Sequence, residues 1–115
     1  MILTSLFDDI LLEIKNNLSN GSFGTGTTSE TVADTSLENE IAATIGLVDG
    51  ISIDGLAVNA VRTLGVDEAN GNTITEAGFS DGVKLKVRAT FPGVNKDSTT
   101  SLDFAYGVVL EQENL

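Results

Sequence analysis

The stretch VKLKVRATF, residues 83–91, shows the clearest regular pattern in the chain. Apolar residues alternate with cations and one threonine, and this period of two is the side-chain spacing of a half-buried β-strand. One face of the predicted strand carries five apolar side chains, and the other carries Lys84, Lys86 and Arg88. Pro92-Gly93 follows directly and is expected to end the strand. The stretch therefore predicts a sheet with one buried face and one polar face.

A second alternating stretch lies at residues 102–111 and is expected to pair with residues 83–91 as an antiparallel hairpin across the loop 92–101. Further strands are predicted where β-branched and aliphatic residues lie between turn signals. These strands are 51–53, 56–66 and 74–79. Asn70-Gly71 lies between the last two and is a strong hairpin signal. Residues 37–115 are therefore predicted to form an antiparallel β-sandwich.

The first twenty residues predict an amphipathic helix, because apolar residues recur there at spacings of three and four. A helix with so apolar a stripe needs a surface to pack against. Either the stripe packs on the chain's own sheet, or it docks against a neighbouring subunit. The residues predicted for such a subunit contact are Leu6, Phe7, Ile10, Leu11 and Ile14.

Residues 21–36, GSFGTGTTSETVADTS, separate the predicted helix from the predicted sandwich. Gly-rich polar stretches seldom form a regular element, so a loop or an irregular extended segment is expected here. Gly24 and Gly26 do not form a phosphate-binding loop, because no Gly-Lys-Ser/Thr follows them. The predicted organisation is a single domain with a helix in 1–20, a loop in 21–36 and a sandwich in 37–115. The fold class is α+β, mainly β.

The chain is strongly acidic, with 17 acidic and six basic residues and a formal net charge of -11. Such a charge disfavours nucleic acid and anionic membrane surfaces as partners, because both are bound through clustered Lys and Arg. It fits either a soluble protein dispersed by self-repulsion or a halophilic protein adapted to high salt. The predicted face of Lys84, Lys86 and Arg88 is either a solvated sheet face with cross-strand charge pairs or a docking face for an acidic neighbour, which includes another copy of the chain.

Residue types that carry most catalysis are scarce. The chain has no cysteine and no histidine, which excludes Cys/His zinc sites and every scheme with a thiol or imidazole base. Asp67, Glu68 and Glu76 are candidate acid–base carboxylates, but nothing in the sequence brings them together. The Asp-rich turns 49–54 and 67–72 lack the spacing of a calcium loop. We therefore predict no enzyme activity, no cofactor and no metal site.

The sequence also predicts no membrane association. No apolar run approaches the ~20 residues of a membrane-spanning helix. The first residues lack the basic region of a signal peptide, so synthesis and folding in the cytosol are expected.

Three stretches together resemble a known group of proteins. They are FGTGTTSETVADTSLENEI (23–41), EANGNTITEAGFS (68–80) and KLKVRATF (84–91). Their order is similar to that in small virion structural proteins of tailed phages and archaeal tailed viruses. The resemblance implies a β-sandwich-like subunit of the tail, collar, fibre or capsid surface, located in the virion after synthesis in the host cytoplasm. It implies further copies of the chain, as a homo-oligomer, and other virion proteins as partners.

One departure from that group bears on function. In many of its members an Arg follows the Glu of the LENEI stretch, whereas Ile41 and Ala42 stand there in this chain. No functional residue is therefore transferred to that position. The alternative function is a host receptor- or carbohydrate-binding module, for which Phe23 and Phe79 are the candidate exposed aromatics.

Overall fold

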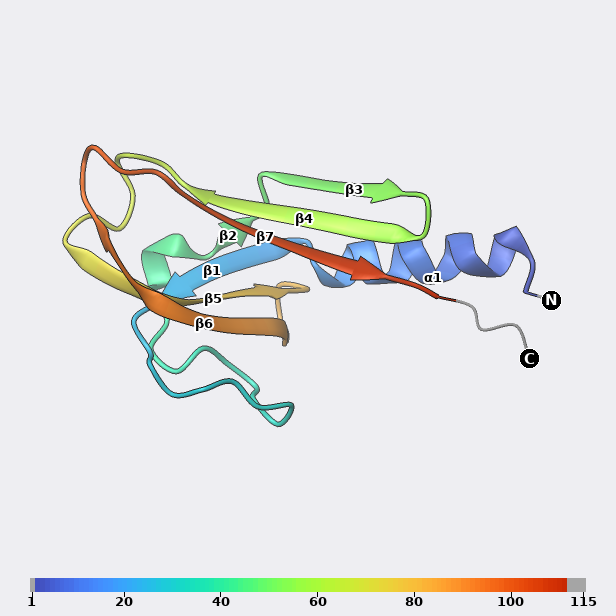
Figure 1. The fold of residues 1–115 in the computed structure, drawn as a ribbon, viewed down its shortest axis with the longest axis horizontal. Helices are drawn as coiled ribbons and strands as arrows, with labels where there is room; N and C mark the ends of the chain where they lie inside the picture. The colour runs from blue at the N-terminus through green and yellow to red at the C-terminus, as the bar shows by residue number, and fades with distance from the viewer. Residues whose placement is uncertain (1, 112–115) are drawn as a thin grey trace.

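The computed structural model describes residues 2–111, and within them it contains a helix and two antiparallel β-sheets (Figure 1). The fold is therefore mainly β with an N-terminal helix, as predicted. Residues 1 and 112–115, the ends of the predicted ranges 1–20 and 37–115, lie outside the described residues. The elements are α1 (Thr4–Asn17), β1 (Asn20–Gly24), the 3-10 helix η1 (Ala42–Thr44), β2 (Gly46–Leu47), β3 (Gly50–Asp54), β4 (Ala57–Leu64), β5 (Asn72–Ser80), β6 (Leu85–Lys96) and β7 (Leu102–Val109).

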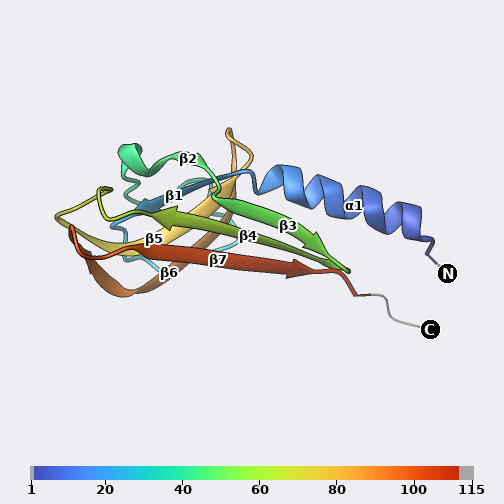
Figure 2. The same cartoon turned by 90° about the horizontal axis from the view of Figure 1, so that it is seen from above.

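The strands form two packed layers. Sheet A has the strand order β2-β1-β5-β6, and sheet B has the order β3-β4-β7. Helix α1 lies end to end with sheet A, so that sheet A and α1 together cover one face of the longer sheet B (Figures 1 and 2). Leu11 and Leu18 accordingly pack with Val58 and Ala60 of β4. The apolar stripe of the helix therefore does pack in part on the chain's own sheet.

An aromatic stack joins the two sheets. The rings of Phe79 in β5 and Phe104 in β7 lie 5.1 Å apart between centroids and within 15° of parallel. This packing explains why the predicted hairpin of residues 83–91 with residues 102–111 is wrong. The two strands present their apolar faces to each other across the core, so β6 pairs with β5 and β7 pairs with β4.

The signals at Asn70-Gly71 and Pro92-Gly93 do not have the predicted effect on the strands around them. Gly71 has the positive φ of 87° that its turn requires, but the turn connects β4 in sheet B to β5 in sheet A and closes no hairpin. Pro92 does not end the strand, because β6 continues to Lys96. The β5–β6 register shifts between Ile74 and Glu76, which places Pro92 at a bulge in an edge strand, where its missing N–H costs no ladder bond.

The predicted loop 21–36 is wrong for its first residues. Asn20–Gly24 form β1, which pairs with β2 on one side and β5 on the other. Phe23 is fully buried there. Pairing on both sides overrides the weak strand propensity of the Gly/Ser-rich sequence. The irregular segment that follows, residues 25–41, crosses the outer face of sheet A, and we call it the strap (Figure 1).

Gly78 allows the strap to lie close to sheet A, and this generates a prediction. A Cβ at Gly78 would lie 3.1 Å from Cδ2 of Leu37 in the strap and 2.6 Å from the carbonyl oxygen of Val87, a backbone atom of the neighbouring strand. We expect Gly78→Ala to lower the free energy of unfolding by about 2 kcal/mol through overpacking. Gly50→Ala is the matched control, because a Cβ there would meet nothing within 4 Å. Urea denaturation checks both; equal stabilities of the two variants would contradict the close approach.

Candidate functional site

Glu76 is a fully buried carboxylate in β5, beneath the strap, and several hydrogen-bond donors surround it. One of its oxygens, Oε2, accepts hydrogen bonds from the amides of Gly26 at 2.8 Å and Asn39 at 2.7 Å. The other, Oε1, accepts from the Glu38 amide at 2.8 Å and from Nε of Arg88 at 3.0 Å. Four donors therefore converge on one carboxylate, and three of them belong to the backbone of the strap.

The Gly-Thr-Gly sequence 24–26 makes this arrangement possible. A Cβ at Gly24 or at Gly26 would lie 2.5 Å from Oε2 of Glu76, so only glycine lets the backbone approach the carboxylate this closely. Burial by itself would raise the pKa of Glu76, but the amides of Asn39 and Glu38 and the Arg88 guanidinium outweigh it and hold the pKa below its ordinary value of 4.5. The buried group is therefore an anion that organises the strap.

Arg88 is the cation that this anion requires. Its side chain is 5% exposed, and its Nη1 donates to Asp34 at 2.9 Å while Nη2 donates to the Thr28 carbonyl at 2.8 Å. A single guanidinium thus joins β6 to two places in the strap, Thr28 and Asp34. Its planar set of donors suits three acceptors in different directions, which a lysine ammonium would not satisfy in the same way.

The position of Arg88 separates it from the other two cations of the predicted basic face, Lys84 and Lys86. Arg88 is engaged within the chain, whereas Lys84 lies exposed in the turn before β6. Lys86 is partly exposed on β6, with its ammonium 3.9 Å from an Asp81 oxygen. The three cations therefore do not form one free surface. Docking of an acidic neighbour stays a prediction for Lys84 and Lys86.

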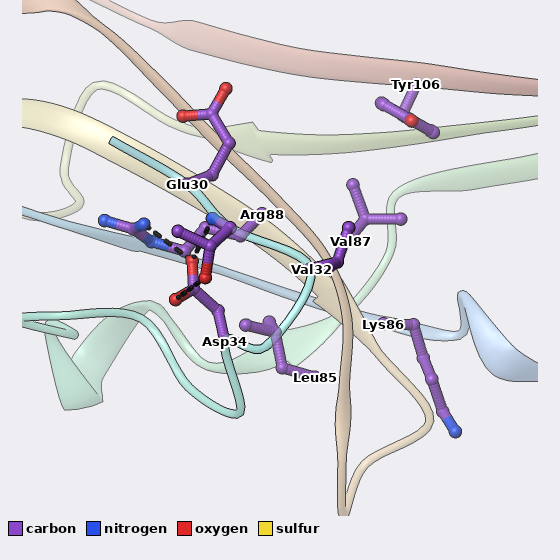
Figure 3. A pocket seen from close by; sticks show the side chains of 9 residues that line it. Glu30, Val32, Asp34, Leu85, Lys86, Val87, Arg88 and Tyr106 are labelled. Atoms are coloured by element: carbon purple, nitrogen blue, oxygen red, sulfur yellow. Dashed lines mark hydrogen bonds and ion pairs between the residues drawn. The ribbon is translucent and has the colours of Figure 1, made fainter. Parts of the chain in front are cut away.

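A shallow pocket of about 300 Å³ lies where the strap, β6 and β7 meet (Figure 3). Tyr106 of β7 borders it with 41% of its surface exposed. The carboxylates at its rim are already bonded, since Glu30 accepts from the Thr90 hydroxyl and Asp34 accepts from Arg88 and Thr31. The pocket offers an aromatic surface, but its carboxylates serve the strap and do not form an acid–base pair.

Glu68 and Glu76, two of the three candidate acid–base carboxylates, do not come together, and the third, Asp67, is exposed in the turn before β5. Glu68 accepts from the Gly65 amide and lies 3.7 Å from Arg62 Nη2, while Glu76 bonds the strap and Arg88. The two groups share no partner in the part of the chain that the structure describes. Within residues 2–111 no group of three or more acidic side chains is placed to hold a metal ion, and no helix is long and apolar enough to cross a membrane.

Helix α1 presents the predicted contact residues in two different settings. Leu11 is buried, and Phe7 and Ile14 are half-buried. Leu6 and Ile10 remain exposed, at 48% and 37%. Leu3 and Leu12 add further apolar surface on and beside the helix. The helix thus uses one side for its own sheet and leaves apolar side chains open elsewhere.

Sequence reasoning missed the role of Glu76 and misplaced the aromatics. Phe23 and Phe79, proposed as exposed aromatics of a binding module, are both fully buried, because β1 and β5 are inner strands of sheet A. Tyr106 is an exposed aromatic that borders the pocket beside the strap. The one signal for Glu76 was an acidic residue in a predicted strand that directly precedes the strand of Arg88 in the sequence, since opposite charges on neighbouring strands can pair across a sheet.

Replacement of Glu76 by Gln tests the anchor of the strap. The amide nitrogen of Gln would face either two backbone N–H donors or one backbone donor and Arg88. We expect Glu76→Gln to lower the free energy of unfolding by about 3 kcal/mol and to speed hydrogen exchange at the amides of Gly26 and Asn39. Asp9→Asn, the same charge change at an exposed helix residue, is the control. Unchanged exchange at both amides would contradict the anchoring role.

The lowered pKa of Glu76 also predicts a pH dependence. A carboxyl whose pKa is lower in the folded state stabilises the fold above its unfolded pKa, and this contribution is lost as the pH falls through the folded pKa. The difference in stability between the wild type and Glu76→Gln should therefore be constant above about pH 5 and shrink as the pH is lowered beyond that. Urea midpoints from pH 7 to pH 3 measure it. A difference that grows on acidification would show that Glu76 is not held as an anion.

Comparisons of this chain with protein-family models, with curated protein sequences and with solved structures found no match.

Proposed function

We propose that this chain is a non-enzymatic structural subunit that acts by contact with neighbouring subunits, and that the assembly is a virus particle. The observation that carries the proposal is the open apolar surface of α1. Five large aliphatic residues in the first twelve positions are substantially exposed: Ile2, Leu3, Leu6, Ile10 and Leu12. Leu6 and Ile10 lie four residues apart and so share one side of the helix, and exposed apolar residues gathered on one side mark interaction surfaces in soluble proteins.

The position of α1 fits such a contact. The helix extends away from sheet A along one end of an elongated molecule of 52 × 27 × 24 Å (Figures 1 and 2). An apolar groove of about 360 Å³ runs beside it, between Ile10 and Ile14 on the helix, Leu18 directly after it, and Val87 and Val108 on the strands. A neighbour that covers Leu6 and Ile10 would also close this groove, and burial of that apolar area would stabilise the contact.

The charged groups support a structural role over a catalytic one. Arg88 bonds both Glu76 and Asp34, and Glu76 also accepts bonds from three backbone amides of the strap, so these groups hold the fold. The virion assignment itself rests on the resemblance of the stretches 23–41, 68–80 and 84–91 to small virion proteins. Under that assignment the chain is a multimeric subunit of the tail, collar, fibre or capsid surface.

A carbohydrate- or receptor-binding module is the second candidate, and the pocket beside Tyr106 favours it. Exposed aromatic rings are common at ligand sites because they combine an apolar surface with a polar edge. Tyr106 provides such a ring next to Lys86. Binding on a glycan array that is lost in Tyr106→Ala would support this candidate over a purely structural subunit.

The contact role of α1 predicts a loss of assembly on charge insertion. We expect Leu6→Asp to abolish the association that α1 makes with co-expressed particle proteins, because a carboxylate cannot be buried unpaired in an apolar contact. Its thermal unfolding midpoint should stay within about 3 °C of the wild type, since Leu6 is half exposed. Leu47→Asp, at a 75% exposed leucine on β2, is the control. Sedimentation velocity and electron microscopy provide the measurements, and assembly by Leu6→Asp equal to the control would refute the contact.

A further inference from the structure

Strand β7 is an open edge of sheet B. Among the described residues it pairs with β4 and with no strand on its other side. The Leu110 amide donates to the Leu56 carbonyl at 2.8 Å, and the register continues as Val108 opposite Val58. In an antiparallel ladder, directly opposed residues alternate between hydrogen-bonded and non-bonded pairs. The even-numbered residues of β7 therefore bond β4, and the odd-numbered residues direct their N–H and C=O groups away from it.

This edge lacks the features that usually protect an exposed strand. Natural edge strands are blocked by proline, by lysine, by bulges or by a covering segment. Strand β6, the matching edge of sheet A, has both Pro92 and a register shift. Strand β7 pairs with β4 over its full length without a shift, and contains neither proline nor lysine. The four residues whose backbone groups point outward are themselves exposed; they are Asp103, Ala105, Gly107 and Val109.

We propose that β7 pairs antiparallel with β7 of a second copy of this chain, so that two three-stranded sheets join into one continuous sheet across a two-fold axis. An antiparallel edge is self-complementary, which is the requirement for a closed dimer. With Tyr106 at the axis, Ala105 of each copy lies opposite Gly107 of the other. This register uses all four outward residues of each strand and yields about eight hydrogen bonds.

The side chains of β7 favour a second copy as the occupant. In the register centred on Tyr106, Asp103 lies opposite Val109 of the other copy, so the one acidic residue of the strand never opposes itself. Ala105 and Gly107 present little bulk on the outer face. Tyr106, which is exposed although it points to the core side of sheet B, would meet its own counterpart, and aromatic cross-strand pairs stabilise sheets.

The net charge predicts how this pairing depends on salt. Each copy carries -11, so two copies repel each other at low ionic strength and the repulsion is screened in salt. A dimer should therefore become tighter as salt rises. An added strand from a basic peptide, the other occupant that charge would favour, should bind more weakly as salt rises.

The experiment is sedimentation equilibrium of the whole chain at low and molar salt, with Ala105→Pro and Ala105→Val compared with the wild type. The wild type should approach twice its 12.0 kDa, more completely in molar salt. Proline at position 105 removes an outward N–H and leaves the bonds to β4 in place, so it should raise the dissociation constant at least about tenfold. Ala105→Val keeps the N–H and should dimerise like the wild type.

Controls separate this contact from the contact through α1. Circular dichroism should show Ala105→Pro folded, and Leu6→Asp should retain the β7 dimer although it lacks the helix contact. A wild type that stays at 12.0 kDa in both salts, or a dimer that Ala105→Pro leaves unchanged, would overturn the proposal. A dimer lost in Leu6→Asp and kept in Ala105→Pro would overturn the β7 pairing and leave the proposed function intact.

Discussion

The strap is held by one buried carboxylate, and much of the architecture of sheet A follows from its presence. Glu76 accepts bonds from Gly26, Glu38 and Asn39 along the strap and from Arg88 on the neighbouring strand. A buried charge without partners would be costly, so each donor is a requirement of the fold. The need to pair this buried charge explains the glycines at 24 and 26, the position of Arg88 and the course of residues 25–41.

Arg62 is a second buried cation, and it links the two sheets as Arg88 links sheet A to the strap. Arg62 on β4 in sheet B donates to the carbonyls of Gly21 on β1 and Thr44 on η1, and it forms a salt bridge with Asp49. Together with the stack of Phe79 on Phe104, it fixes how the two sheets face each other. In a chain with six basic residues, two arginines are therefore committed to internal structure, and the acidic surface is left with few cations to offset it.

Local pattern predicted the elements of this fold better than their arrangement. The helix, the alternating strands β6 and β7 and the turn between the predicted strands 51–53 and 56–66 follow from periodicity and turn chemistry, which depend on neighbouring residues alone. The partner of each strand depends on which apolar faces meet across the core, and alternation looks the same for a hairpin and for two facing sheets. The strand β1 was hidden because its pairing on both sides, and not its glycine- and serine-rich sequence, makes it a strand.

The candidate site shows the same limit. Sequence alone identified Leu6, Phe7, Ile10, Leu11 and Ile14 as one stripe, but only the packing of α1 on β3 and β4 divides them into buried and open residues. The cations of β6 looked equivalent by alternation. Their environments differ because Arg88 lies beneath the strap, beside Glu76, and Lys86 lies beyond it. Burial of a charged side chain depends on contacts with distant residues, which period and composition do not report.

The distance along the chain between Glu76 and its partners has a consequence for how the protein folds. Gly26 lies 50 residues before Glu76, and Thr28 lies 60 residues before Arg88, whereas β5 and β6 are joined by a short turn. Long chain closures are entropically costly and slow, so the β5–β6 hairpin is expected to form early and the strap to close late. Until it closes, the outer face of sheet A carries an anion and a guanidinium still in contact with water. Desolvation of this pair is then one of the last steps of folding, and it commits the chain to its native topology.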